Sequence, residues 1–104
     1  MVRGTRIVWA PNALQSRKSI FAYWNKRNKS NDFSKKINLL IYEKIDLLKN
    51  FPLTGVEIQN EDARILHFHN YSLVYKISQS EIYILAFWDN RQNPSKLLEI
   101  LKLK

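Results

Sequence analysis

Two histidines, a lysine and an arginine in the second half of the 104-residue sequence have the chemistry needed to move protons and stabilise anions. His67 and His69 are separated by one residue, and Lys76 and Arg91 follow in later segments. Histidines titrate near neutral pH, and cations stabilise the charge that develops on a reacting phosphate. His67, His69, Lys76 and Arg91 are therefore candidate catalytic residues of a nuclease.

Strand periodicity predicts how these groups face one another. In a regular strand, residues two apart share a face and lie about 7 Å apart, so His67 and His69 would point the same way. Ser72 and Lys76 would lie on the matching face of the next strand. Arg64 is out of phase with both histidines, so we expect it to anchor a loop or a carboxylate. The alternative, which we favour, is a polar sheet face that contacts solvent or a binding partner.

Three apolar runs, at 63–69, 71–78 and 82–88, must position these groups. The second alternates apolar and polar residues, the period of a half-buried strand, and the third is apolar on both faces, as in a central strand. The connections, Asn70 and residues 78–80, are too short for anything but antiparallel neighbours. The sequence therefore predicts a three-stranded antiparallel meander, with Asn70 in the left-handed conformation of a tight turn.

A short strand at 6–9 and two helices precede the meander. The first helix begins at Pro11, which suits the first helical position, and runs to about Arg27. The second follows Ser30, a plausible N-cap, and stops at Phe51-Pro52. About three residues join the helices, so they must form an antiparallel hairpin.

The remaining segments complete an α+β fold. Residues 53–62 contain Gly55 and are predicted to form a loop, and a short apolar C-terminal helix begins at Pro94. The length fits one domain, residues 1–104. The predicted order is a strand, a helix hairpin, a three-stranded meander and a C-terminal helix.

Positive charge is concentrated in the first half of the chain. The sequence has 17 Lys and Arg against 9 Asp and Glu, a formal net charge of +8. Residues 1–50 hold 11 basic and 3 acidic side chains, so the whole surplus lies there. This asymmetry indicates a polyanionic or acidic protein partner, although lysines also solubilise helices. The cations expected on the outer face of the helix hairpin are Arg17, Lys18, Lys26, Arg27, Lys29, Lys35 and Lys36.

Composition excludes several classes of protein. The absence of cysteine excludes disulfide scaffolds and thiolate metal sites, and is compatible with a reducing cytosol. The N-terminus lacks the apolar segment of a signal peptide, and no run is long enough to cross a membrane. We expect a soluble cytoplasmic protein with no metal, no cofactor and no membrane partner.

An ordered set of short motifs resembles the RelE/ParE superfamily, the toxins of bacterial type II toxin–antitoxin pairs. No single motif is specific, but together they cover nearly the whole chain. They are Trp9-Ala10-Pro11, Tyr23-Trp24 with Arg27-Asn28, Phe51-Pro52 followed by Gly55, Arg64, the strand Tyr71-Ser72-Leu73-Val74-Tyr75-Lys76-Ile77, and Phe87-Trp88-Asp89-Asn90-Arg91-Gln92-Asn93-Pro94.

The resemblance implies one of two toxic mechanisms. RelE-like members cut messenger RNA on the ribosome without metal, whereas ParE-like members inhibit DNA gyrase. The lysines and the first arginine that RelE-like enzymes use fall here on Ala63, Ile65 and Ser72. Arg91, or Gln92 with a one-residue shift, meets the last-strand arginine, and the C-terminal helix has neither Tyr nor His. The sequence therefore favours target inhibition over RNA cleavage.

The resemblance also implies partners and site residues. A cognate antitoxin would wrap the toxin with an acidic segment that folds on binding, giving a hetero-oligomer. The hairpin cations would bind this antitoxin or the target, and Arg64, Arg91 and Gln92 would serve toxicity or anchoring. The alternatives are a metal-independent mRNA endonuclease, either ribosome-dependent or free, and a non-toxic binding module with the same fold.

Overall fold

The computed structural model describes residues 6–58 and 62–91. The predicted C-terminal helix and Gln92 lie outside the described residues. Within the described part of the chain, no helix has the length and apolar character needed to cross a membrane.

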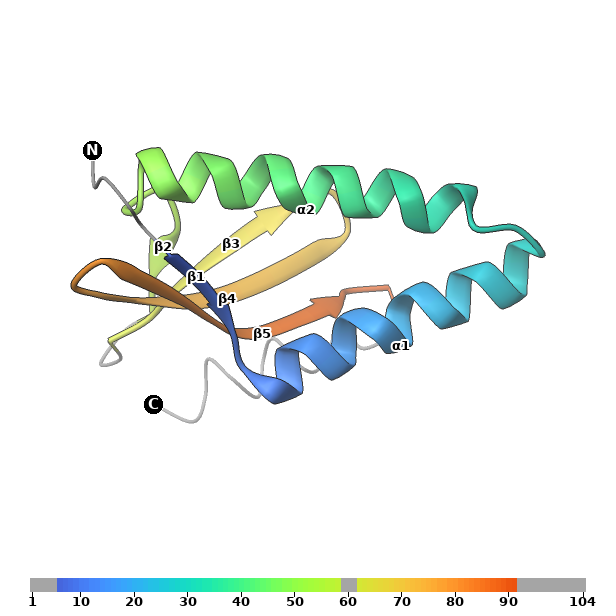
Figure 1. Ribbon diagram of the computed structural model, residues 1–104, viewed down its shortest axis with the longest axis horizontal. Helices are drawn as coiled ribbons and strands as arrows, with labels where there is room; N and C mark the ends of the chain where they lie inside the picture. The colour runs from blue at the N-terminus through green and yellow to red at the C-terminus, as the bar shows by residue number, and fades with distance from the viewer. Residues whose placement is uncertain (1–5, 59–61, 92–104) are drawn as a thin grey trace.

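The described residues form two helices on a five-stranded sheet with the order β1-β5-β4-β3-β2 (Figure 1). The strands are β1 (Arg6–Trp9), β2 (Val56–Glu57), β3 (Arg64–Phe68), β4 (Tyr71–Ser78) and β5 (Glu81–Asp89). Strands β3, β4 and β5 form the antiparallel meander that the three apolar runs predict. Strand β1 pairs with β5 in parallel, which the intervening helix hairpin makes possible because a parallel return needs a long connection.

Two details of the strands differ from the sequence prediction. The predicted loop at 53–62 contains β2, whose Val56 pairs with Ile65 of β3; two residues are too short to show a periodic pattern. The first hairpin turn is His69-Asn70, because Phe68 pairs with Tyr71. His69 rather than Asn70 takes the positive φ, 56°, so His69 belongs to the turn and not to the strand.

The helix hairpin consists of α1 (Pro11–Asn28) and α2 (Asp32–Asn50). In Figure 1 the helices form a V that closes at the short α1–α2 turn. Lys29 closes α1 in the left-handed conformation, with φ 54°. Helix α2 begins at Asp32, so Asn31 rather than Ser30 occupies the cap position; the Ser30 hydroxyl instead accepts the Asp32 N–H at 3.1 Å.

The core lies between the helices and one face of the sheet. The apolar residues of α2 recur every three or four positions, which places them on one side of the helix, and this side is buried against alternate residues of β4 and β5. The buried residues of this core are Ala13, Ile20, Ile37, Ile41, Ile45, Leu48, Phe68, Tyr71, Leu73, Tyr75, Ile82, Ile84 and Phe87. A second cluster, Ile58, Ile65, Val74 and Trp88, occupies the opposite face of the sheet.

The segment after α2 is fastened to the sheet by the phenol of Tyr75, which is fully buried. The Tyr75 hydroxyl donates to the Pro52 carbonyl at 2.7 Å and accepts the Gly55 N–H at 2.8 Å. Gly55 lies so close that a Cβ there would be 2.7 Å from the Tyr75 ring carbon Cε1 and hydroxyl oxygen. The turn therefore requires glycine for its close approach.

The substitution G55A tests this contact. We expect it to lower the free energy of unfolding by about 1–3 kcal/mol, because the added methyl group overlaps the buried Tyr75 ring. Urea unfolding of the full chain measures the change. V56A, at a side chain that is 68% exposed, is the control and should change stability by less than about 0.5 kcal/mol. Equal stability of G55A and wild type would contradict the packing argument.

Candidate functional site: two arginine anchors and a basic hairpin

His67 takes part in a short polar chain on the sheet face opposite the helices. Its Nδ1 lies 2.8 Å from the Ser72 Oγ, and the Ser72 hydroxyl donates to Asn90 Oδ1 at 3.1 Å. The Ser72 hydroxyl has one proton, and it donates this proton in the hydrogen bond to Asn90. In the bond between His67 and Ser72, the histidine Nδ1 must therefore be the donor. The imidazole of His67 is exposed.

The structure does not bring the four candidate catalytic residues together. His69 lies in the turn after β3, so its expected place beside His67 on a strand face is wrong. Lys76 is on the same face as Ser72 but about 13 Å further along β4, and its Nζ lies 3.8 Å from Asp62. Arg91 contacts the helices on the other side of the sheet. Proton-transfer groups and phosphate-binding cations are therefore separated.

Arg91 is held at the end of β5 by the carboxylate of Asp89, which is 1% exposed. Its Nε and Nη2 donate to the two carboxylate oxygens at 3.1 and 3.0 Å, and its backbone N–H donates at 2.9 Å. The indole N–H of Trp24 also donates to Asp89, at 3.0 Å. One carboxylate thus connects the end of the sheet to α1.

Aromatic rings enclose the Arg91 guanidinium. Its central carbon lies 4.6 Å from the centre of the Trp24 ring, 5.5 Å from Tyr71 and 5.8 Å from Phe33, and Nη2 donates to the Tyr71 hydroxyl at 2.8 Å. The hydrogen bond with Asp89 raises the pKa of Arg91 above its usual value, so the guanidinium stays charged. Stacking and pairing fix Arg91 as an anchor, with its side chain 37% exposed.

Burial raises the pKa of Tyr71 to about 12. The negative charge of Asp89 adds to this rise, and the positive charge of Arg91 opposes it. Sequence reasoning selected Arg91 but missed Asp89, Trp24 and Tyr71 as its partners. The available signal was an acidic residue at the end of an apolar strand, two residues before an arginine.

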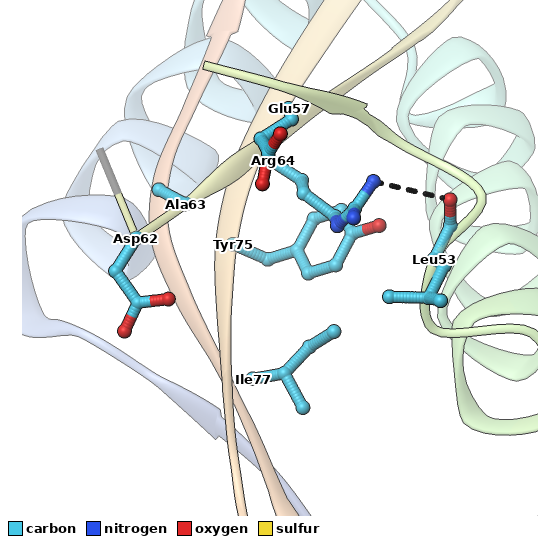
Figure 2. Close-up of a pocket in the computed structure, with 7 residues that line it drawn as sticks. All are labelled: Leu53, Glu57, Asp62, Ala63, Arg64, Tyr75 and Ile77. Atoms are coloured by element: carbon cyan, nitrogen blue, oxygen red, sulfur yellow. Dashed lines mark hydrogen bonds between the residues drawn. The ribbon is translucent and has the colours of Figure 1, made fainter. Parts of the chain in front are cut away.

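Arg64 lies on the helix-facing side of β3, out of phase with His67, as alternation predicts. Its Nη1 donates to the carbonyls of Gly55 at 2.7 Å and Leu53 at 3.3 Å, so it anchors the segment after α2 (Figure 2). A cavity of about 160 Å³ adjoins it, and Figure 2 shows Asp62 and Ile77 on its other sides. This volume suits one side chain and is below the range of cofactor sites, which starts at about 300 Å³.

Metal binding has little support in residues 6–58 and 62–91. No group of three or more His, Asp or Glu side chains in those ranges is arranged to hold a metal ion.

The basic hairpin is exposed at every predicted position except Arg17. Lys18, Lys26, Arg27, Lys29, Lys35 and Lys36 are exposed. Arg17 instead lies between the helices, where it hydrogen-bonds Asn38 and stacks 4.9 Å from Trp9 and 5.6 Å from Tyr42. It lies one helical turn from Ala13 and Ile20, both buried, so its expected outward position is wrong.

Comparison with known proteins agrees with this architecture. The sequence model of a family described as the ParE toxin of the type II toxin–antitoxin system parDE matches residues 7–94. The chain belongs to the ParE toxin family. The resemblance to RelE/ParE toxins is thereby confirmed.

A solved structure shares the ParE-family fold. It is titled as the chromosomal ParDE toxin–antitoxin system from P. aeruginosa, and it is 17% identical with a TM-score of 0.65. The match covers 82% of this chain and 95% of that chain. No curated protein sequence matches significantly.

The Arg91 anchor of this ParE-family chain leads to a stability prediction. We expect R91A to lower the free energy of unfolding by about 2 kcal/mol, below the 3–5 typical of fully buried pairs, because Arg91 is partly exposed. R91K keeps the positive charge but loses the two parallel N–H donors of the guanidinium, so it should lower the free energy of unfolding by less than R91A. Urea unfolding measures both.

The variant D89N/R91A distinguishes the cause of this loss. If R91A is destabilising because it leaves the buried Asp89 carboxylate unpaired, D89N/R91A, which removes that charge, should be more stable than R91A. A double variant less stable than R91A would show that the Asp89 carboxylate still stabilises the fold without the guanidinium, through the N–H groups of Trp24 and of the residue-91 backbone.

The raised pKa of Tyr71 predicts a loss of stability at alkaline pH. Between about pH 10 and pH 12 the unfolded chain ionises this phenol while the folded chain keeps it neutral, so the free energy of unfolding falls as pH rises. Y71F removes this contribution, and its stability should decline less than that of wild type over the same range. Y23F, at an exposed tyrosine, should follow the wild-type curve.

Proposed function

We propose that this chain arrests growth by binding and inhibiting a DNA-handling target, DNA gyrase, and that a cognate acidic antitoxin neutralises it. Membership of the ParE family is the observation that carries this proposal. The proposal implies action in the cytoplasm.

The geometry of the sheet supports inhibition by binding rather than cleavage of RNA. Attack by a ribose 2′-hydroxyl needs a base, an acid and cations around one phosphate. His67 has Ser72 as its hydrogen-bond partner, and the charge of Arg91 is matched by Asp89. These groups belong to opposite sides of the sheet, which argues against a shared phosphate site.

The surface around α1 supports an acidic antitoxin as a partner. The net charge of +8 complements an acidic segment. Beside Lys18 and Arg17, the side chains of Leu14, Leu39 and Tyr42 are 38%, 64% and 56% exposed. Apolar anchors next to cations are what an amphipathic, acidic segment requires, and we assign the exposed Lys18 to antitoxin binding, while the half-buried Arg17 supports Tyr42 at this surface.

The remaining candidate residues are assigned to the target. Lys26, Arg27, Lys35 and Lys36 lie near the α1–α2 turn, and all four are exposed. They would remain available to a target that carries negative charge. The ParDE title names a toxin–antitoxin system for the P. aeruginosa protein, and we extend that pairing to this chain as a proposal.

Gyrase assays test the proposed activity. We expect the purified chain to inhibit DNA supercoiling by gyrase, and induction of the chain to arrest growth while transcripts stay intact. H67Q should arrest growth as fully as wild type, since His67 has no role in inhibition by binding. New transcript 5′ ends that appear on induction and disappear with H67Q would show cleavage of RNA and overturn the proposal.

Co-expression tests the antitoxin. We expect the product of the adjacent gene to restore growth, and K18E to weaken its binding. Growth arrest without gyrase inhibition would remove the target and leave the antitoxin pairing standing.

A further inference from the structure

The α1–α2 turn carries a dense cluster of positive charge that no ion pair among the described residues neutralises. Residues 26–36 contain five cations and one acid, Asp32. The cations, here called the tip cluster, are Lys26, Arg27, Lys29, Lys35 and Lys36, and all are exposed. The ion pairs in the described part of the chain involve Arg6, Lys76 and Arg91 instead. Figure 1 shows the turn projecting beyond the sheet at the closed end of the V.

The tip cluster contains more cations than neighbouring apolar side chains. The large exposed hydrophobic side chains within one helical turn of it are Tyr23, before Lys26, and Leu39, after Lys35 and Lys36. Phe33 is within the turn region but packs against Trp24, with ring centres 5.1 Å apart. Protein interfaces depend on buried apolar anchors, whereas binding to a nucleic acid backbone depends on cations and the release of counterions. The surface therefore fits phosphates better than an acidic protein.

The backbone that carries the tip cluster is fixed in place. The Ser34 hydroxyl, on a residue 6% exposed, donates to the Phe21 carbonyl at 3.2 Å and joins the two helices. Trp24 is hydrogen-bonded to Asp89, which ties the same region to the sheet. Lys29 and Ser30 both donate backbone N–H groups to Asn25. The cations thus project from rigid helix ends, so little backbone entropy is lost on binding.

We propose that the tip cluster binds the phosphodiester backbone of duplex DNA. We expect binding to be independent of sequence, because the cations of the cluster pair with phosphates, which every base pair carries. The site extends the proposed function: on a target that holds DNA, the tip would contact that DNA. The inference does not depend on gyrase, since the chain alone should bind.

Fluorescence anisotropy with a short labelled DNA duplex of arbitrary sequence tests the proposal. The variant K29N/K36Q removes two tip cations, and asparagine tolerates the left-handed conformation at position 29. We expect it to weaken binding at least about tenfold at low salt, and to reduce the slope of log K against log salt by about 1.8. The matched control K44Q/K49Q removes two cations from the other end of α2 and should keep the wild-type slope.

A second tip variant controls for the possibility that the first variant loses binding because it misfolds. K26Q/K35Q should show the same loss, and thermal melts should place all three double variants near wild type. Equal weakening by tip and control variants would overturn the proposal, because it would show a net-charge effect without a site. Stronger binding to poly-glutamate than to DNA of equal charge, lost in the tip variants, would also overturn it and identify an acidic protein as the partner. DNA binding without gyrase inhibition would uphold the tip site while rejecting the proposed target.

Discussion

The buried carboxylate of Asp89 is the constraint on which the arrangement of sheet and helices depends. It accepts hydrogen bonds from Trp24 of α1 and from Arg91 beyond β5, at 2.9–3.1 Å. A buried charge is stable only when it is paired and hydrogen-bonded, so the partners cannot move independently. The guanidinium, in turn, stacks on rings from both helices and from β4. The position of the V-shaped hairpin on the sheet is thus fixed by electrostatics as well as by apolar packing.

The two faces of the sheet differ in what they can do. One face is filled by the helices and contributes anchors, Arg64 and Arg91, whose donors are directed at the protein's own carbonyls and carboxylate. The other face carries the polar chain of His67, Ser72 and Asn90 over a small apolar cluster. In residues 6–58 and 62–91, the histidine and the two arginine anchors thus lie on different faces. This separation is the geometric basis of the proposed inhibition by binding.

The exposed surface of the hairpin also divides into two parts. Along the middle of the hairpin, the exposed side chains of Leu14, Leu39 and Tyr42 accompany Lys18, the combination that suits an amphipathic protein segment. At the closed end the five cations of the tip cluster outnumber the neighbouring apolar side chains, Tyr23 and Leu39, and such an excess of cations suits phosphates. On the proposals made here, one pair of helices serves two partners of different chemistry.

The sequence by itself determined the two helices, the meander and the family, because helical spacing and strand alternation are local patterns. It also placed Arg64 and His67 on opposite faces, which follows from strand parity alone. Only the tertiary structure decided that Arg17 turns inward, that β1 pairs with β5, and that His69 forms the turn. It also selected Asp89 as the partner of Trp24, 65 positions away in the chain. These outcomes depend on contacts between distant segments, whose geometry no local periodicity encodes.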